Sequence, residues 1–344
     1  MNSKKVLVLA TSRKTRGGIT AVLSAYEHFP FWAKYKVYWI ETHIDRGIVW
    51  KLFYAFVALI KYVCVVWQYD IVHIHTSELP SVQRKYVFFK IAKVLRKKVV
   101  VHLHIGNQLN EVRGNKLYKN LFEGADAILV LSQSIRLKLE QDFGVRNKVY
   151  VLYNPCPKIE SPSYTDNYKE IVFAGTLNAN KGYSVLIRAF AKLAKEFPDW
   201  KLVIAGNGEL EQAQKIVLDC KIEKQVVFPG WVRGSDKESL FRRASVFCLA
   251  SFAEGFPMAV LDAWSYGIPV VSTPVGGLPD VLLDNKNVLF FTSGNIEELS
   301  DKLRRIIIDQ KLRYALSQES LGLSKGLFSE NKINEQIDLL YKSL

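Results

Sequence analysis

The chain of 344 residues is poor in cysteine, and its few cysteines are far apart. Cys64, Cys156, Cys220 and Cys248 form no Cys-x-x-Cys pair and have no histidine at metal-binding spacing. This pattern excludes a disulfide framework and a zinc-finger type of site, and it predicts reduced thiols in a cytoplasmic protein. The first ten residues, MNSKKVLVLA, lack the regions of a secretory signal peptide and are typical of a first strand.

Acidic residues are scarce in one half of the chain only. Residues 1–160 hold 25 Lys and Arg against 11 Asp and Glu, whereas residues 161–344 hold 22 of each kind. The whole formal charge of +14 therefore lies in the first half. Such an excess indicates a polyanionic partner: anionic lipid, nucleic acid or a phosphate-bearing substrate. Because no recognition-helix or RNP-type motif occurs, nucleic-acid binding has only the charge in its favour.

Apolar segments of strand length alternate with helix-period segments along the whole chain. Near-continuous apolar strands between helices indicate parallel sheets that are covered on both faces. We therefore expect an α/β protein with two doubly wound domains, residues 1–160 and 161–344, joined near the proline-containing linker 154–167. A final helix near 328–344 is a candidate to pack back on the first domain. The expected strands are 5–10, 35–41, 70–75, 97–104, 127–132, 149–154, 170–175, 200–206, 225–230, 245–251, 269–273 and 288–291.

Two glycine-containing loops follow strands, where ligands of such sheets bind. The loop TSRKTRGGIT places Gly17 and Gly18 before a helix, where backbone N–H groups can approach an anion. The loop FAGTLNANKGYSV places Lys181 before the next helix, where its ammonium group can hold a phosphate. A tight turn and a solvated lysine are the plain alternatives for these two loops.

The segment SFAEGFPMAVLDAW puts a carboxylate at the mouth of a helix. Pro257 fits the first helical turn, and Met258 and Ala259 then offer uncommitted N–H groups. Glu254 can accept hydrogen bonds from sugar hydroxyls but would repel phosphate. We therefore expect Glu254 to face the neutral part of a ligand whose anionic part is held by the amides and Lys181. Simple helix capping by Glu254 is the alternative.

These motifs together resemble a known family. The stretch EGFPMAVLDAWSYGIPVVSTPVGGLPDV is similar to the signature of the retaining, nucleotide-sugar-dependent glycosyltransferases of family 4, which have the GT-B fold. The segments HIH, HLHIG, GTLNANKG, IAGNGE and FPGWV occur in the family's order over nearly the whole chain. The resemblance implies two Rossmann-like domains facing each other across a cleft, the first for the acceptor and the second for the nucleotide sugar.

The resemblance also implies roles for single residues. Glu254 would bind the donor sugar, and Lys181 would neutralise the diphosphate leaving group. His104 matches the family's active-site histidine, with His102 as runner-up, and the nucleobase is expected near Trp231. The implied catalytic residues are His104, Glu254 and Lys181, and the implied donor-binding residues are Gly17, Gly18, Lys181, Glu254, Gly255, Phe256, Met258, Ala259 and Asp262.

Two positions depart from the family's pattern. The second carboxylate is Asp262 instead of glutamate, and Thr176 stands where the family usually has a phosphate-binding arginine. No Asp-x-Asp motif occurs, which favours transfer without a metal or other cofactor, with Lys181 and helix amides in the metal's place. The resemblance further implies retention at the anomeric carbon by a same-face mechanism. On cleft closure, three basic residues could replace the missing arginine: Arg13, Lys14 and Arg16.

Two segments of the first half bear on membrane association. Residues 48–67 have nearly the length of a membrane span, but Lys51 and Lys61 interrupt them and they lie between two strands. A spanning helix, a largely buried helix and a helix partly inserted into a bilayer surface all remain open, and burial is favoured. Residues 83–98 interleave basic and apolar side chains, as is typical of a helix on an anionic membrane, although a solvated face over the core is the alternative. The basic residues expected at the membrane are Arg84, Lys85, Lys90, Lys93, Arg96, Lys97 and Lys98.

The sequence thus predicts a retaining, metal-independent glycosyltransferase that uses a nucleotide-diphosphate sugar. The acceptor is expected to be a lipid-linked saccharide, and the product a bacterial-type surface polysaccharide such as capsule or lipopolysaccharide. The enzyme is expected on the cytoplasmic face of the plasma membrane, bound peripherally. A nucleotide-sugar epimerase of the same fold and a basic nucleic-acid-binding module are the alternatives.

Overall fold

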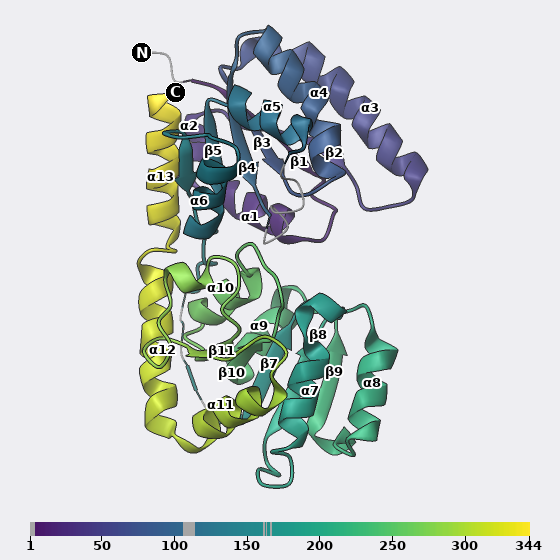
Figure 1. Cartoon of the computed structure of the whole chain (residues 1–344), viewed down its shortest axis with the longest axis vertical. Coiled ribbons are helices and arrows are strands. Elements are labelled where there is room, and N and C mark those ends of the chain that lie inside the picture. Colours follow the sequence, from purple (N-terminus) through teal and green to yellow (C-terminus); the bar gives the residue numbers. More distant parts are fainter. Residues whose placement is uncertain (1–3, 106–113, 161, 163, 166) are drawn as a thin grey trace. The chain divides into compact units, whose positions relative to one another are not determined.

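The computed structural model describes residues 4–344 except 106–113, 161, 163 and 166 (Figure 1). The chain divides into two compact units, which we call unit 1 and unit 2. Unit 1 comprises residues 1–155 together with 330–344, and unit 2 comprises residues 156–329. The division falls inside the predicted linker 154–167, and the C-terminal segment belongs to unit 1.

Unit 1 is built on a parallel sheet with the strand order β2-β1-β3-β4-β5-β6. Its central strands are apolar and buried over almost their whole length, as a sheet covered by helices on both faces requires. The strands are β1 Val6–Thr11, β2 Tyr38–His43, β3 Ile71–Thr76, β4 Lys98–Leu103, β5 Ala127–Val130 and β6 Val149–Val151. The helices are α1 Gly18–Tyr26, α2 Pro30–Lys34, α3 Ile48–Val65, α4 Ser81–Val94, α5 Lys116–Gly124, α6 Gln133–Asp142 and α13 Glu330–Ser343, with a 3-10 turn η1 at Val66–Gln68.

Unit 2 repeats this plan with the strand order β12-β11-β10-β7-β8-β9. The side chains of Asn295 and Asp309 cap two of its helices by accepting hydrogen bonds from backbone N–H groups of the first turn. The strands are β7 Glu170–Ala174, β8 Lys201–Ala205, β9 Val226–Gly230, β10 Ala244–Leu249, β11 Val270–Ser272 and β12 Leu289–Phe290. The helices are α7 Tyr183–Ala191, α8 Leu210–Asp219, α9 Gly234–Arg243, α10 Met258–Ser265, α11 Ile296–Ile308 and α12 Gln310–Lys325.

The predicted α/β fold with two doubly wound sheets is confirmed, and each predicted strand segment coincides with an observed strand to within a few residues. The strand order reverses direction once in each sheet. In unit 2 the chain builds β7, β8 and β9 outward and then continues on the other side of β7 with β10. In unit 1 the reversal lies between β1 and β3. Ligands of open α/β sheets bind beyond the carboxyl ends of the strands at such a reversal, so these two places are where a site is sought.

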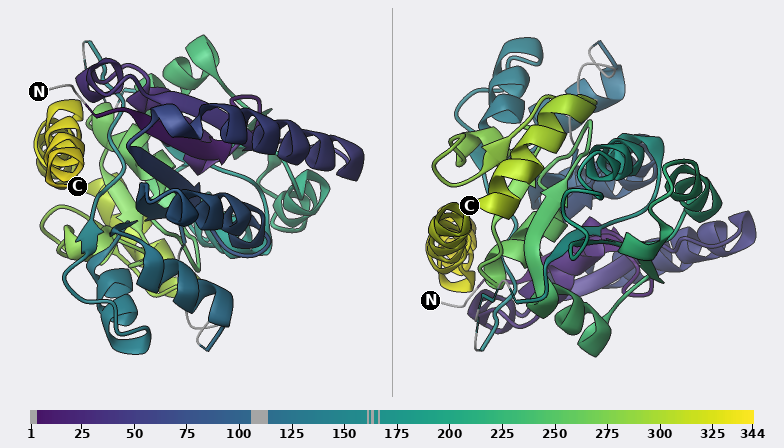
Figure 2. Two further views of the ribbon diagram at one scale, coloured as in Figure 1. Left: turned by 90° about the horizontal axis from the view of Figure 1, so that it is seen from above. Right: turned by 90° about the horizontal axis from the view of Figure 1, so that it is seen from below.

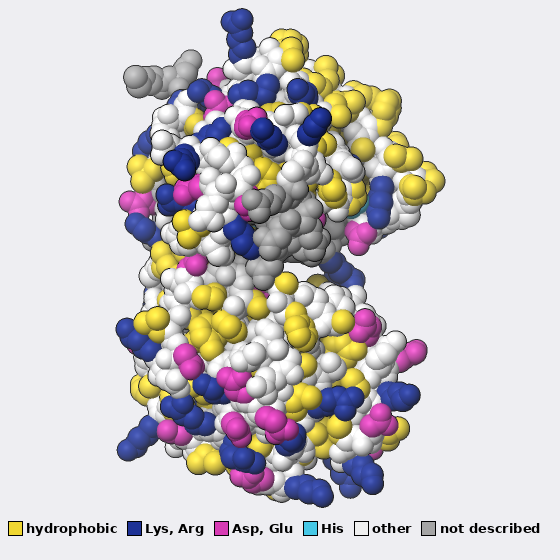
Figure 3. Space-filling view, in the orientation of Figure 1, with side chains coloured by type: hydrophobic (Ala, Val, Ile, Leu, Met, Phe, Trp, Pro, Cys, Tyr) yellow, Lys and Arg dark blue, Asp and Glu magenta, His cyan; other side chains and the backbone are white. Residues whose placement is uncertain are grey.

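Helix α3 contradicts the favoured prediction of a largely buried helix. It packs against β2 and buries only Ala58 and Tyr62 fully, and it projects beyond the sheet (Figures 1 and 2). Together with η1 it is long and apolar enough to cross a membrane by length and composition alone. The apolar side chains along its outer face are visible at the upper right of Figure 3. We call the following exposed residues the α3 patch: Ile48, Val49, Trp50, Leu52, Phe53, Phe56, Ile60, Val63 and Trp67.

Helix α13 completes the core of unit 1 from the far end of the chain. The Tyr341 hydroxyl lies 2.6 Å from Nδ1 of His73 on β3. The side-chain oxygen of Asn334 accepts a hydrogen bond from the backbone N–H of Phe31 at 2.9 Å. The ring of Tyr341 also packs edge-on against those of Phe31 and Tyr35. The C-terminal helix is therefore a structural part of unit 1.

Candidate active site

The loops that follow β7 and β10 meet at the strand reversal of unit 2, and each carries a predicted site residue. Lys181 ends the first loop and Glu254 lies in the second. Nζ of Lys181 is 2.5 Å from Oε1 of Glu254, and the Ser251 hydroxyl donates to the same oxygen at 2.7 Å. The cation predicted for phosphate and the carboxylate predicted for sugar are thus in direct contact, and both are mostly buried.

Backbone contacts hold these two loops together. The backbone carbonyl of Asn180 accepts from the N–H of Phe252 at 2.8 Å, and the Asn180 side-chain amide donates to the carbonyl of Ala253 at 2.9 Å. Gly182 follows directly with φ of 64°, and a Cβ there would lie 2.0 Å from the carbonyl oxygen of Ala250. Only glycine allows this approach, so the backbone itself positions Lys181 beside Glu254.

The second glycine pair of the signature supports the same place. Gly276 has φ of 60°, and a Cβ there would lie 2.3 Å from the carbonyl oxygen of Gly255. The next residue, Gly277, donates its N–H to that carbonyl at 2.9 Å. The turn after β11 therefore holds the backbone immediately after Glu254.

Helix α10 begins at Met258, and Pro257 is its N-cap. The proline therefore lies one residue before the first helical turn, in which the sequence predicts it. The ring of Phe256 is buried against those of Trp264 and Phe328. This anchors the entry to the helix, whose first N–H groups, including those of Met258 and Ala259, find no acceptor within the helix. The helix start therefore carries partial positive charge beside Glu254, which suits an anion.

Asp262 lies in α10 and is 9% exposed. Burial raises the pKa of this carboxyl group, and Lys237 on α9 opposes the rise with Nζ 2.7 Å from Oδ1. Thr176 follows β7 and is exposed, so no basic side chain replaces the missing arginine at that position. Trp231 follows β9 at the same edge of the sheet and is partly exposed.

The loop between β1 and α1 has its two glycines at the start of a helix, as predicted, but its Arg13 is bound within unit 1. Gly17 is the N-cap of α1 with φ of 152°, Gly18 begins the helix, and a Cβ on Gly17 would meet open space. Arg13, one of three candidates for the missing phosphate cation, is instead bound by the carboxylates of Glu27 and Glu41 and lies over the ring of Trp39. These contacts occupy its guanidinium group within unit 1.

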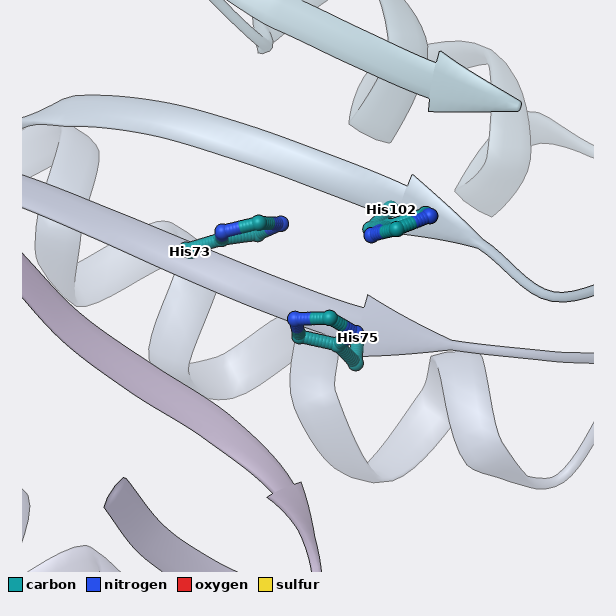
Figure 4. Close-up of side chains that lie close together, drawn as sticks. All are labelled: His73, His75 and His102. Carbon is teal, nitrogen blue, oxygen red and sulfur yellow. The ribbon is translucent and has the colours of Figure 1, made fainter. Parts of the chain in front are cut away.

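Histidines from two neighbouring strands stack at the carboxyl edge of unit 1. His73 and His75 lie on β3 and His102 on β4, and Figure 4 shows their rings turned toward one another. His104 follows β4 directly, and its Nε2 is 3.0 Å from Nδ1 of His75. Burial lowers the pKa of His73 and of His104 to about 3, and those of His75 and His102 well below 6.5, so all four rings are neutral at pH 7.

The two histidines considered for catalysis differ in access. His104 is partly exposed, whereas His102 is fully buried beneath it, with the ring centroids 4.3 Å apart. His102 does share a strand face with His104, but it faces the core and cannot touch a substrate. Burial therefore favours His104 over the runner-up, His102.

His73, His75 and His102 are also the described residues most capable of holding a metal ion, with nitrogens within 4.8 Å of one another. Their rings lie nearly parallel, at 17° to 41°, so the in-plane lone pairs run side by side instead of converging. The set contains no carboxylate to offset a divalent charge. Tetrahedral zinc requires convergent ligands, and the arrangement is better explained as packing of neutral rings.

The basic helix α4 is less uniform than its sequence suggests. Lys85 was assigned to a membrane surface by its charge, but it is 2% exposed and points into unit 1, so that assignment is wrong. Within α4, Arg84 is half-buried and Lys93 binds Asp126. The helix ends at Val94, so Lys97 and Lys98 of the predicted basic segment lie outside it: Lys97 donates to the carbonyl of Trp67, and Lys98 begins β4 and binds Asp126. The helical period turns Lys85 toward the core of unit 1, and the basic composition of the segment does not reveal this. The members of the set that remain well exposed are Lys90, Arg96 and Lys98.

Comparison with known protein families gives a match for each half of the chain. The model of Glycosyltransferase Family 4 matches residues 9–157, and the model of Glycosyl transferases group 1 matches residues 158–321. The chain therefore consists of a Glycosyltransferase Family 4 domain followed by a Glycosyl transferases group 1 domain. The two models divide at almost the same place as the two structural units.

The relatives carry glycosyltransferase names, and the solved structures share the fold. An uncharacterized glycosyltransferase of Haemophilus influenzae is 28% identical over 64% of this chain and 64% of its own length. An N-acetylgalactosaminyltransferase of Campylobacter jejuni, named for a PP-undecaprenol-linked saccharide, is 29% identical over 56% of this chain and 53% of its own. Anabaena HepE, solved with UDP and with UDP-glucose, matches with a TM-score of 0.80, at 20% and 18% identity, over 99% of this chain and 100% of that chain. The chain thus spans less than two-thirds of the curated relatives' length.

Three polar neighbours of the candidate site residues were not predicted from the sequence. Lys237 binds Asp262, Ser251 binds Glu254 and His75 binds His104. Ser251 opens the segment that contains Glu254, and His75 ends the HIH segment, so their positions at strand ends offered a weak signal. Lys237 lies on a different helix from its partner, 25 residues earlier, and its motif context gave no signal.

Proposed function

We propose that this glycosyltransferase moves a sugar from a nucleotide-diphosphate sugar to a saccharide acceptor, with retention at the anomeric carbon and without a metal. The observation that carries the proposal is the contact between Lys181 and Glu254 beside the start of α10. An ammonium group and helix N–H groups suit a diphosphate, and a carboxylate suits sugar hydroxyls. The arrangement offers a polar partner to both parts of a nucleotide sugar.

The chemistry follows from charge development. As the bond between the anomeric carbon and the diphosphate oxygen breaks, negative charge grows on the diphosphate, and Lys181 with the α10 amides stabilises it. Glu254, oriented by Ser251, accepts hydrogen bonds from the sugar hydroxyls. Donor binding therefore exchanges the contact between Lys181 and Glu254 for contacts with substrate. The leaving phosphate oxygen then takes the proton of the acceptor hydroxyl on the same face, which gives retention.

Further roles are proposed for single residues of each unit. Asp262, held by Lys237, binds the ribose, and the nucleobase lies toward Trp231. His104 in unit 1 acts on the transferred sugar as a neutral hydrogen-bonding group, since burial lowers its pKa to about 3. Gly17 and Gly18 contribute backbone N–H groups from unit 1.

Relatives support a substrate class. HepE was solved with UDP and UDP-glucose, which favours a UDP-sugar as the donor to test first. The Campylobacter jejuni relative is named for a saccharide on PP-undecaprenol, which favours a lipid-linked acceptor in surface polysaccharide synthesis, such as capsule or lipopolysaccharide. The basic first half and the α3 patch support peripheral binding to the cytoplasmic face of the plasma membrane.

The donor assignment is tested by thermal stabilisation with a panel of UDP-, GDP- and ADP-sugars, followed by transfer assays with the stabilising donor, in buffer with EDTA. We expect Glu254→Gln and Lys181→Ala each to lower transfer by at least about a hundredfold while the melting temperature stays near that of the wild type. The matched control is Lys192→Ala, since Lys192 forms an exposed pair with Glu297 at the same 2.5 Å. Normal turnover of either site variant would refute the assignment.

The same assay separates the alternatives. A changed sugar nucleotide formed without any acceptor would indicate an epimerase. Binding to duplex DNA as strongly as to anionic vesicles would favour a nucleic-acid-binding module. Loss of transfer in EDTA with recovery on adding Mg²⁺ would overturn metal independence.

A further inference from the structure

Two adjacent basic side chains lie at the carboxyl edge of the unit 1 sheet and are withdrawn from water. Helix α4 begins five residues after β3 ends, so its first turns lie at this edge. Lys85 is 2% exposed and Arg84 is half-buried. Ser81, Arg84 and Lys85 share one face of the helix, since they are three and four residues apart.

These two cations have no carboxylate partner in the part of the chain that the structure describes. Nζ of Lys85 donates to the Ser81 hydroxyl at 3.1 Å, and that hydroxyl also bonds Thr76. Nε of Arg84 is enclosed and has no hydrogen-bond partner. Elsewhere in unit 1, Lys93 and Lys34 bind Asp126 and Asp338. Burial and the charge of Arg84 lower the pKa of Lys85 to about 7, so its ammonium group is only partly protonated at pH 7. An anion beside Arg84 and Lys85 would favour the charged form of the lysine and offset the cost of burying both groups, so a site for an anion is indicated.

Most of the groups around Arg84 and Lys85 are cationic or neutral, and Asp45, the carboxylate that acts on His43, is paired with Lys51 at 3.6 Å. His43 ends β2, and burial together with the charges of Arg84, Lys51 and Lys85 lowers its pKa to about 4. His75 and His104 follow at the ends of β3 and β4, and both also feel the charge of Lys85. The strands involved flank the reversal between β1 and β3, where a ligand of unit 1 would bind.

We propose that Arg84 and Lys85 bind an oxyanion, a phosphate or a carboxylate, carried by the acceptor. Arg84 contacts the anion with its planar guanidinium group, and Lys85 adds positive charge from behind it. The proposal rests on the proposed function in one respect, that unit 1 receives the acceptor. It gives a reason for a lysine in a position that an apolar residue would fill at lower cost.

The test is a calorimetric titration of the full chain with inorganic phosphate and, separately, with glucuronate. We expect Arg84→Gln to weaken binding by about tenfold or more and Lys85→Met by about threefold or more. Arg136→Gln and Lys119→Met are the matched controls, because both residues form exposed pairs within their own helices. Lys85→Met should also raise the melting temperature in the absence of anion, which shows that the variant folds.

Each outcome decides between possibilities. Phosphate binding alone assigns a phosphorylated or lipid-diphosphate acceptor, and glucuronate binding alone assigns an acidic sugar. The proposal is overturned if neither anion binds, if Arg84→Gln and Lys85→Met bind both anions like the wild type, or if Lys181→Ala removes the phosphate site. Failure of every sugar nucleotide to stabilise the chain would refute the donor proposal instead, and would leave an Arg84-dependent anion site standing.

Discussion

Asp262 shows how a single residue depends on a partner from another helix. Its carboxylate is buried in α10, where desolvation raises its pKa and so favours the neutral form. The nearby ammonium group of Lys237 favours the charged form, which the proposed ribose contact needs. Asp262 therefore works as a hydrogen-bond acceptor because Lys237 is present.

Lys237→Ala should destabilise the folded chain by about 1–2 kcal/mol, because it leaves a buried carboxylate without its cation. The effect is small because the Lys237 side chain is 42% exposed, so water screens the pair. Urea denaturation at pH 7 measures the change. Adding Asp262→Asn to Lys237→Ala should recover most of the loss, whereas Lys192→Ala, at an exposed pair, should cost less than about 1 kcal/mol. Equal losses for both lysine variants would show that the pair contributes no special stability.

At the scale of elements, the histidines of β3 and β4 make the sheet sensitive to acid. Burial holds the pKa of His73 and His104 at about 3 in the folded chain, whereas an unfolded histidine titrates near pH 6.5. Between these values the unfolded chain binds more protons. The free energy of unfolding therefore falls as the pH drops from about 6.5 toward 3, by up to about 1.4 kcal/mol per pH unit for each histidine.

Urea midpoints measured between pH 7 and pH 4 should show this fall. His102→Phe should flatten it, because His102 is fully buried and its pKa is also well below 6.5. His28→Gln is the control, since His28 is exposed, and its curve should follow that of the wild type. A midpoint that stays constant over this range would contradict neutral, buried rings.

Helix α3 carries the other prediction at this scale. An apolar patch of this size on one helix, in the basic half of the chain, suits a bilayer with anionic headgroups. The double variant Phe53→Glu, Phe56→Glu should lower partitioning onto phosphatidylglycerol vesicles by at least about tenfold. Its melting temperature should change little, because both rings are more than half exposed.

Vesicle sedimentation measures this effect. The double variant Leu218→Glu, Ile308→Glu is matched in charge and exposure but lies in unit 2, and it should sediment like the wild type. Unchanged sedimentation of the α3 variant would exclude the patch as the membrane contact. If sedimentation velocity instead showed a dimer that only the α3 variant loses, the patch would be assigned to a second copy of the chain.

At the scale of the whole molecule, the sequence predicted the fold well and the side-chain partners poorly. The strands were found because a parallel sheet buried on both faces needs continuous apolar runs, and these are local. The signature around Glu254 also located its loop, since Gly182 and Gly276 leave room that only glycine can. Composition led to wrong predictions of burial for α3 and Lys85, because the composition of an apolar or basic segment does not show which of its side chains face the core. Contacts such as Lys237 with Asp262 depend on tertiary packing, which no local pattern contains.

The packing of α13 in unit 1 joins residues that are far apart in the sequence, and its contribution to stability can be tested. Tyr341 is buried, bonds His73 and packs on aromatic rings of unit 1. Tyr341→Ala should cost roughly 3–5 kcal/mol by opening a cavity, and Tyr341→Phe about 1 kcal/mol by removing one hydrogen bond. Leu339→Ala, on the exposed side of the same helix, should stay within about 0.5 kcal/mol.

Hydrogen exchange can locate that loss within the chain. Amides of β3 and β4 report on unit 1, and amides of β7 and β10 report on unit 2. If α13 belongs to the core of unit 1, Tyr341→Ala should speed exchange in β3 and β4 and leave β7 and β10 near their wild-type rates. Equal acceleration in both sheets would mean that the two units unfold together, and protection of all four strands would mean that α13 adds little to the core.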